Sequence, residues 1–173
     1  MKFRSRRRFA PAVMLAAFLL TVTPAAFADT LFIIPAGLGC PDFNLGLAFN
    51  PATGGHTETF TDKNGNTVRV ISAVSGVILT YTNYGTDPNN PVAGKSVSIK
   101  TSGHVTTTVT NPDGTLTVTA RGHSGLILFP SDTPAGPTTT QYIGKVVYNI
   151  DADENLTLVS TSGQARDICA ALA

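Results

Sequence analysis

Polar and apolar residues alternate along most of the chain beyond residue 40. In residues 115–121, Leu116, Val118 and Ala120 would lie on one face and three threonines on the other. This period of two is typical of a half-buried β-strand. Such runs mark eleven candidate segments, from which we expect about nine strands and no convincing helix, apart from a helical turn near 170–172. The candidate segments are 43–49, 57–61, 67–74, 77–83, 95–101, 104–110, 115–121, 125–129, 141–150, 156–162 and a closing strand near 163–169.

Turn signals separate these segments at short intervals. Asn64-Gly65 tolerates positive φ at both central positions of a tight hairpin, and Asn111–Gly114 has the residues of a type I turn. Many short strands with such spacing indicate a sandwich or a barrel. We therefore predict an all-β fold, an antiparallel β-sandwich of the Greek-key or jelly-roll kind, with a small closed β-barrel as the alternative.

The composition supports strands over helices. Residues 29–173 contain 23 threonines but only two glutamates, and β-branched residues favour strands. A threonine-rich outer face would keep so weakly charged a sheet protein in solution. The predicted core consists of Val68, Val70, Val74, Ile78, Val97, Ile99, Val105, Val109, Leu116, Val118, Ile127, Phe129, Val146, Tyr148 and Leu158.

The first 28 residues have the order of an export signal. Five basic residues precede an apolar stretch, and Ala26-Phe27-Ala28 provides small residues for cleavage after Ala28. The apolar stretch is shorter than the roughly 20 residues of a membrane-spanning helix. We expect a signal peptide at 1–28, one domain at 29–173 and a secreted, extracellular protein, exported by the general or the twin-arginine route.

Removal of this signal changes the charge of the chain. The signal takes five of the twelve basic residues and none of the eleven acidic ones, so seven against eleven leaves a net charge of −4. Without a basic run, the mature chain is not expected to bind nucleic acid. It also has no second apolar segment long enough to span a membrane. The expected partner is an unknown molecule of the envelope or the extracellular space.

Cys40 and Cys169 are the only cysteines, and they lie near the two ends of the mature chain. In an oxidising compartment such a pair usually forms a disulfide. The bond would close a loop of about 130 residues, which the chain-entropy treatment values at roughly 5 kcal/mol. A reactive thiol would need an activating base or a C-x-x-C spacing. Neither is visible, so we predict a structural disulfide.

Three segments carry a family resemblance: Cys40-Pro41-Asp42-Phe43, residues 125–130 ("GLILFP") and residues 162–173 ("SGQARDICAALA"). In these the chain resembles a group of small exported actinobacterial proteins with an all-β body and no assigned activity. The resemblance implies an exported β domain and transfers no catalytic residue.

Candidate chemistry is sparse. Gly122-His123-Ser124-Gly125 is the nearest approach to the G-x-S-x-G turn of serine hydrolases, but it lacks one spacer residue. His123 and Ser124 are neighbours along a strand, so they would point to opposite faces. Flat aromatic platforms for sugars would have to come from four tyrosines, because the chain has no tryptophan.

Metal ligands are also few. His56 and Glu58 would share a strand face, and with His104 and His123 they are the residues nearest to a transition-metal set. The Asp151-x-Asp153-x-Asn155 opening of a calcium loop lacks the glycine and glutamate of an EF-hand, and Asx residues also favour hairpin tips. We assign no catalytic, cofactor or metal site.

The sequence thus favours a non-catalytic, exported β-sandwich module that contacts a cell-envelope, glycan or protein partner. The alternatives are a small metal-dependent enzyme or hydrolase using His56, Glu58, His104 and His123, and a β-barrel carrier of an apolar ligand.

Overall fold

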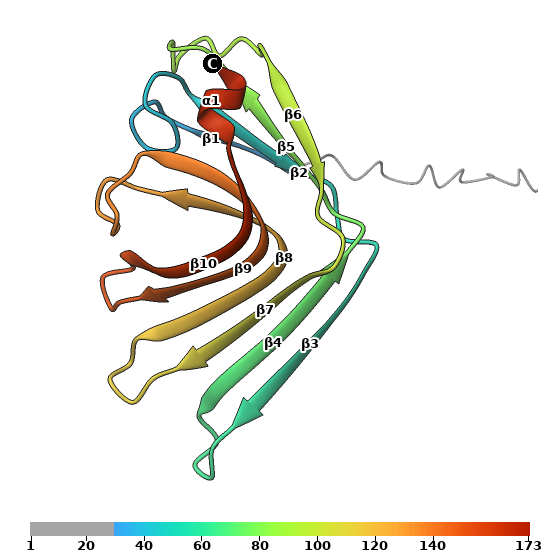
Figure 1. Cartoon of the computed structure of the whole chain (residues 1–173), viewed down its shortest axis with the longest axis vertical. Coiled ribbons are helices and arrows are strands. Elements are labelled where there is room, and N and C mark those ends of the chain that lie inside the picture. The colour runs from blue at the N-terminus through green and yellow to red at the C-terminus, as the bar shows by residue number, and fades with distance from the viewer. Residues whose placement is uncertain (1–29) are drawn as a thin grey trace, which may run out of the picture.

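The computed structural model describes residues 30–173; residues 1–29, with the predicted signal peptide, lie outside the described residues. The described part contains ten strands and one short helix (Figure 1). They are β1 (Thr30–Ile34), β2 (Leu45–Phe49), β3 (Gly54–Thr61), β4 (Thr67–Ser75), β5 (Ile78–Asn83), β6 (Ser96–Lys100), β7 (His104–Thr110), β8 (Leu116–Leu128), β9 (Thr138–Ile150), β10 (Leu156–Asp167) and α1 (Ile168–Leu172).

The strands form two antiparallel sheets. One has the order β1-β2-β5-β6 and the other the order β10-β9-β8-β7-β4-β3. The chain crosses between them after β2, β4 and β6. The predicted antiparallel sandwich is confirmed. The closed-barrel alternative is wrong, because within residues 30–173 each sheet ends in two edge strands instead of closing on itself.

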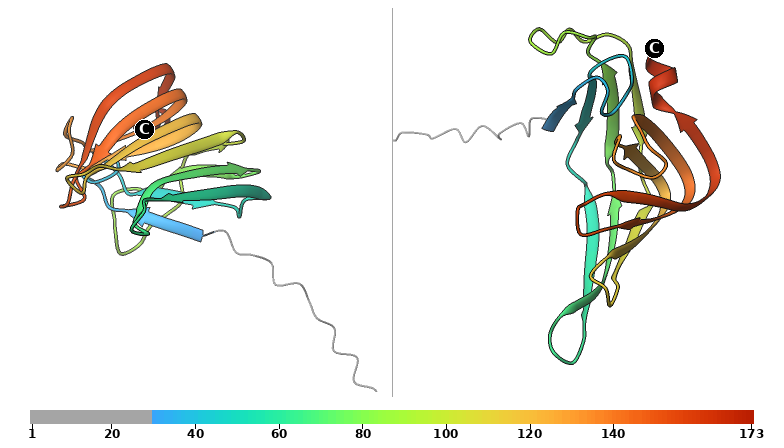
Figure 2. Two further views of the ribbon diagram at one scale, coloured as in Figure 1. Left: turned by 90° about the horizontal axis from the view of Figure 1, so that it is seen from below. Right: turned by 90° about the vertical axis from the view of Figure 1, so that its left-hand side faces the viewer.

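A row of three glycines bends the larger sheet. Gly122 of β8 pairs with Gly144 of β9, which pairs with Gly163 of β10, and all three have positive φ. Figures 1 and 2 show these strands curving sharply. The bend gives each strand two halves. The half of β8 that ends at Leu128 lies under the four-stranded sheet, together with the halves of β9 and β10 beside it. The other halves continue the part of the larger sheet that contains β7, β4 and β3.

The sandwich has two separate hydrophobic cores. The first lies between the sheets and under α1, and includes Leu45, Tyr81, Ile168 and Leu172, each at most 1% exposed. Ile127 packs against it, while its neighbours Leu126 and Leu128 point to the opposite face and form the second core with Val146. The loop after β8 closes over the start of β10, where Asp132 accepts a hydrogen bond from the Leu156 amide (2.8 Å).

Two predicted strand boundaries were wrong for one reason. The segments 115–121 and 125–129 belong to the single strand β8, and 156–162 continues through Gly163 to Asp167 as β10. Each false boundary lies at a glycine with positive φ, Gly122 or Gly163. Here it bends the strand while the ladder of paired residues continues on both sides. Strand β1 was not predicted.

The predicted core was partly correct. Val118 and Val146 are buried, but Val68, Ile78 and Phe129 are 37%, 45% and 39% exposed. Alternation identifies the two faces of a strand, but it does not tell which face another layer covers. Ile78 lies outside the first core, and Val68 lies on β4, which belongs to neither core.

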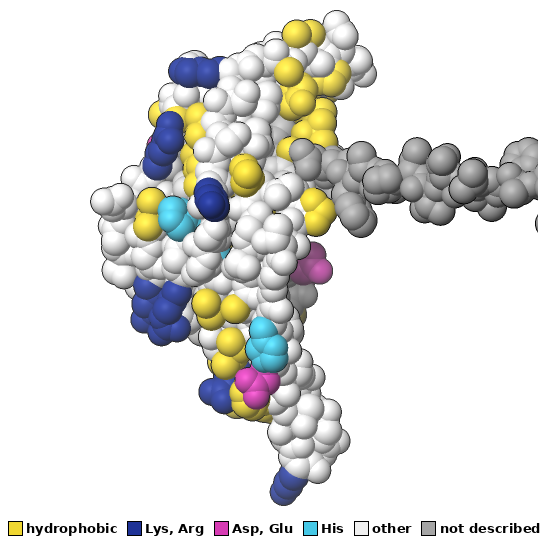
Figure 3. Space-filling model, turned by 90° about the vertical axis from the view of Figure 1, so that its right-hand side faces the viewer, with side chains coloured by type: hydrophobic (Ala, Val, Ile, Leu, Met, Phe, Trp, Pro, Cys, Tyr) yellow, Lys and Arg dark blue, Asp and Glu magenta, His cyan; other side chains and the backbone are white. Residues whose placement is uncertain are grey.

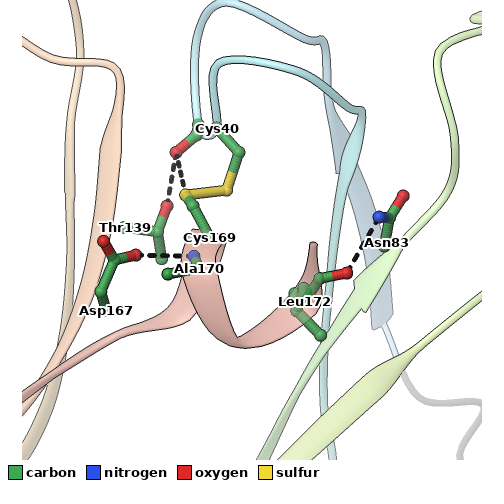
Figure 4. Close-up of a disulfide and its surroundings, with 8 residues drawn as sticks. Cys40, Asn83, Thr139, Asp167, Cys169, Ala170 and Leu172 are labelled. Carbon is green, nitrogen blue, oxygen red and sulfur yellow. Dashed lines mark hydrogen bonds between the residues drawn. A yellow bond between two sulfur atoms is a disulfide. The ribbon is translucent and has the colours of Figure 1, made fainter.

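The predicted disulfide joins Cys40 and Cys169 over a separation of 129 residues, with the two Cα atoms 5.5 Å apart. Figure 4 shows hydrogen bonds around it. Thr139 donates to the Gly39 carbonyl (2.7 Å), and Asp167 caps α1 by accepting from the Ala170 amide (3.0 Å). Asn83 donates to the Leu172 carbonyl (3.1 Å). The C-terminal helix is therefore fixed to both sheets.

Candidate ligand-binding groove

A groove runs along the junction where the chain passes from one sheet to the other. It consists of two adjoining hollows of about 220 and 320 Å³, which share Val74 and His104. We call them the inner hollow and the outer hollow. The inner hollow is lined by Phe49, Val74, Val77, Leu79, Thr101, His104, His123, Ser124 and Gly125, and the outer one by Gly55, His56, Ala73, Val74, Ser75, Gly103, His104 and Val105.

All three histidines of the chain border this groove. His56 of β3 lines the outer hollow, His123 of β8 lines the inner one, and His104 of β7 lines both. Figure 3, which views the side where strands pass between the sheets, shows histidine side chains at separate places on this face. The sheet order places their strands near one another, because β7 lies between β4 and β8 and β4 lies between β7 and β3.

The histidines do not converge on one point. His56 pairs with Ala73 across β4, and Glu58, two residues further along β3, is exposed beside Ile71. His104 instead pairs with Val74 and so faces the other side of the sheet from His56. Within residues 30–173 no group of three or more His, Cys, Asp or Glu side chains is close enough to hold a metal ion.

Ser124, His104 and Thr106 form a hydrogen-bonded chain beside the inner hollow. Ser124 Oγ lies 3.2 Å from His104 Nδ1, and Thr106 Oγ1 lies 2.7 Å from His104 Nε2. Desolvation lowers the pKa of His104, and a backbone hydrogen bond with His123 opposes this shift. A neutral ring has one donor and one acceptor nitrogen, so it can satisfy both hydroxyl groups at once.

The serine partner differs from the one considered in the sequence. His123 adjoins Ser124 along the chain, but Ser124 bonds to His104 on the neighbouring strand. Only the register of β7 and β8 reveals this pair, because the two residues are 20 positions apart. Ser124 is 7% exposed and lies within a paired strand opposite Tyr142. A hydrolytic serine normally lies on a sharp, exposed turn.

His123 has an unusual environment. Its Nδ1 atom is buried and has no hydrogen-bond partner among the described residues. The residue as a whole is only partly buried and lines the inner hollow. Orphaned buried N–H groups are rarer than orphaned acceptors. The favoured tautomer therefore places the proton on Nε2, which makes that atom a donor.

An uncovered apolar surface begins at the inner hollow. Phe49 lines the hollow and stacks on Phe32 with ring centroids 5.9 Å apart. Leu31, Phe32 and Ile33 of the edge strand β1 are 47%, 51% and 41% exposed. By register, Phe32 and Phe49 share the face of the four-stranded sheet that meets the first core, whereas Leu31, Ile33 and Ile78 lie on its other face. We call these five residues, on the two faces around the β1 edge, the apolar surface. Figure 3 shows hydrophobic side chains gathered over the upper part of this face.

The tyrosines do not provide an open sugar platform. Tyr81 is 1% exposed, and Tyr142 and Tyr148 pack against the second core. The Tyr84 ring lies so close to Gly46 that a Cβ there would collide with it. All four tyrosines are buried or partly buried.

Comparison of the chain with protein-family models, curated proteins and solved structures finds no match. In residues 30–173, no helix has both the length and the apolar character needed to cross a membrane.

Proposed function

We propose that the protein is an exported, non-catalytic β-sandwich module that binds an extended apolar segment of another protein, outside the cell or at its envelope. The observation that carries this proposal is the exposure of Leu31, Phe32 and Ile33 on an edge strand. Exposed apolar residues that cluster on a protein surface mark interaction sites.

The edge position of β1 specifies the kind of partner. Its outer side carries backbone N–H and C=O groups that no strand of the four-stranded sheet pairs. Natural proteins usually protect such edges with charges, prolines or bulges. The sequence of β1 contains no charged residue and no proline, and its register with β2 has no bulge. A partner strand would add to this edge and pack its side chains on Phe32 and Phe49.

Export is the second part of the proposal. The structural disulfide in the first core fits an oxidising compartment. The basic, apolar and A-x-A order of the first 28 residues supports the same assignment.

The test is a selection of displayed random peptides on the folded protein, run beside a panel of glycans. We expect selected peptides with alternating apolar residues and no glycan ligand. Phe32→Ser should weaken peptide binding at least about tenfold, since it removes a large apolar contact. Val159→Ser, an equally exposed apolar residue on β10, is the matched control (55% exposed). Glycan binding, or equal effects of the two variants, would refute the proposal.

A hydrolase remains the second candidate because of the hydrogen bond between Ser124 and His104. A fluorophosphonate probe discriminates between the two, because it labels activated serines. We expect no labelling, since Ser124 is nearly inaccessible within its strand. Labelling that disappears in Ser124→Ala but persists in Ser131→Ala would favour the enzyme.

A further inference from the structure

A slot opens between the two sheets at the edge of the four-stranded sheet that lies opposite β1. Strands β6 and β10 are edge strands of the two sheets, and α1, which follows β10, contacts β6 (Figure 1). The slot has a volume of about 200 Å³ and is lined by Ile99, Gln141, Ile143, Gln164, Ala165 and Arg166. An apolar cavity of about 150 Å³ takes up benzene, so the slot is large enough for one ring with a small substituent.

The side chains that line the slot lie on faces that meet. Arg166 pairs with Gln141 across β10 and β9, and Gln164 pairs with Ile143, so these pairs share one face of the larger sheet. Ile99 packs against the first core between the sheets and approaches that face from β6. The slot therefore has apolar walls from Ile99 and Ile143 beside polar side chains.

The polar side of the slot supplies hydrogen-bond donors. Gln141 is 2% exposed, and its Oε1 accepts from the Tyr81 hydroxyl at 3.0 Å. Its Nε2 donates to the Tyr142 carbonyl at 3.3 Å and forms no other hydrogen bond with a described residue. An amide nitrogen has two N–H groups, so one is left for a ligand. Arg166, directly across the ladder from Gln141, adds the donors of a guanidinium group.

The charge of β9 and β10 beside the slot is positive. Asp167 is the only acidic residue of these two strands, and it follows Arg166 directly, so it lies on the other face of the sheet. There it accepts a hydrogen bond from the Ala170 amide. Lys145, two residues after Ile143, adds a second positive charge to the face with the slot. This arrangement favours a ligand with a negative charge.

We propose that the slot binds a small aromatic carboxylate of the size of benzoate. The ring lies between Ile99 and Ile143, and the carboxylate accepts hydrogen bonds from Arg166 and Gln141. A guanidinium group can bind a carboxylate through two parallel N–H···O bonds, which adds geometric specificity. The slot and β1 lie at opposite edges of the four-stranded sheet, so this inference does not depend on the proposed function.

The first experiment titrates benzoate and benzamide into the folded, ¹⁵N-labelled protein and follows the amide signals by NMR. The two probes share the ring and differ in the charge of the substituent. We expect benzoate to shift the signals of Ile143 and Ala165. It should bind at least about tenfold more tightly than benzamide, because hydrogen bonds to charged groups are the stronger ones. Equal affinities, or no binding of benzoate at millimolar concentration, would overturn the proposal.

A pair of arginine variants tests the charged contact. Arg166→Gln removes the charge and keeps an amide donor, so the benzoate affinity should fall to that of benzamide while benzamide binding stays unchanged. Arg69→Gln, which removes an exposed arginine from β4, is the matched control and should leave both affinities unchanged. Equal losses of benzoate affinity in the two variants would mean that benzoate responds to net charge alone, which overturns the proposal.

The apolar wall is tested separately. Ile143→Ser should weaken benzoate and benzamide to the same extent, since both rings lose the same contact. Val159→Ser removes another exposed apolar side chain, on β10, and should change neither affinity. Benzoate binding that is unaffected by Ile143→Ser would place the ligand outside the slot and overturn the proposal.

The last experiment separates a free carboxylate from the end of a polypeptide. It titrates an acetylated tripeptide with a C-terminal phenylalanine into the wild type and into Arg166→Gln. An affinity at or below that of benzoate supports a free ligand. A higher affinity that is lost in Arg166→Gln would assign the slot to the C-terminus of another protein and overturn the proposal of a small carboxylate.

Discussion

At the scale of a single residue, Tyr81 connects the two layers of the sandwich. Its hydroxyl donates to Gln141 Oε1 at 3.0 Å, and both side chains are buried. Gly125 allows this arrangement, because a Cβ at that position would collide with the Tyr81 hydroxyl. Burial raises the pKa of Tyr81 well above the usual range of a tyrosine hydroxyl.

The raised pKa predicts a pH dependence of stability. Above pH 10 the unfolded state releases the Tyr81 proton while the folded state keeps it, so the free energy of unfolding falls as pH rises. At neutral pH, Tyr81→Phe should be less stable than the wild type by about 1 kcal/mol, because Gln141 loses its partner. Between pH 8 and 11 this difference should shrink, as measured by urea unfolding. Parallel pH profiles would contradict the assignment.

The histidines show what single residues can and cannot reveal in a sequence. All three border the groove, but His56 and His104 face opposite sides of the sheet. The bond between His104 and Ser124 was not predictable, because it depends on which strands are neighbours and on their register. Sequence spacing reports contacts along one strand, whereas this contact crosses between two.

At the scale of elements, local turn chemistry was predictable. The hairpin at Asn64-Gly65 forms, with the Asp62 amide donating to the Asn66 carbonyl (2.9 Å). Positive φ was expected at both central positions, but only Gly65 has it, and Asn64 does not. Asp62 also accepts from the backbone amides of Asn64 and Asn66, and mainly the Asn66 bond lowers the pKa of its carboxyl group. The bend at Gly122 was not predictable, because glycine is also common at the ends of strands. Strand β1 was missed because its apolar run does not alternate.

A Gly→Ala substitution should cost more stability within the row of three glycines than at Gly65, which lies in a hairpin outside the row. Gly122→Ala would strain a positive φ and also drive a Cβ into the Gly103 carbonyl. Gly65→Ala strains a similar φ, but nothing lies within 4 Å of the added atom. We expect a loss of about 1 kcal/mol for Gly65→Ala and of about 3 kcal/mol or more for Gly122→Ala. Urea midpoints measure both, and equal losses would show that the bend is not tightly packed.

At the scale of the whole molecule, the disulfide joins two segments that carry much of the first core. Cys40, Phe43 and Leu45 come from one segment, and Ile168 and Leu172 from the other. Sequence predicted this bond because only two cysteines were present. It did not predict that the bond lies inside the core, with Cys40 fully buried.

Removal of the disulfide should therefore destabilise the whole domain. For a separation of 129 residues, loop entropy predicts a loss of up to roughly 5 kcal/mol in Cys40→Ala/Cys169→Ala. Chemical unfolding of this variant should match that of the reduced wild type. A variant as stable as the oxidised wild type would show that packing alone holds the two ends together.

Export and the disulfide are tested most directly by the intact mass of the protein recovered from the culture medium of the cells that produce it. An exported protein that contains the Cys40–Cys169 disulfide should have the mass of residues 29–173 less two hydrogens, and its mass should increase by two hydrogens on reduction. Recovery of the full-length chain inside the cell, or of a secreted chain with two free thiols, would contradict it.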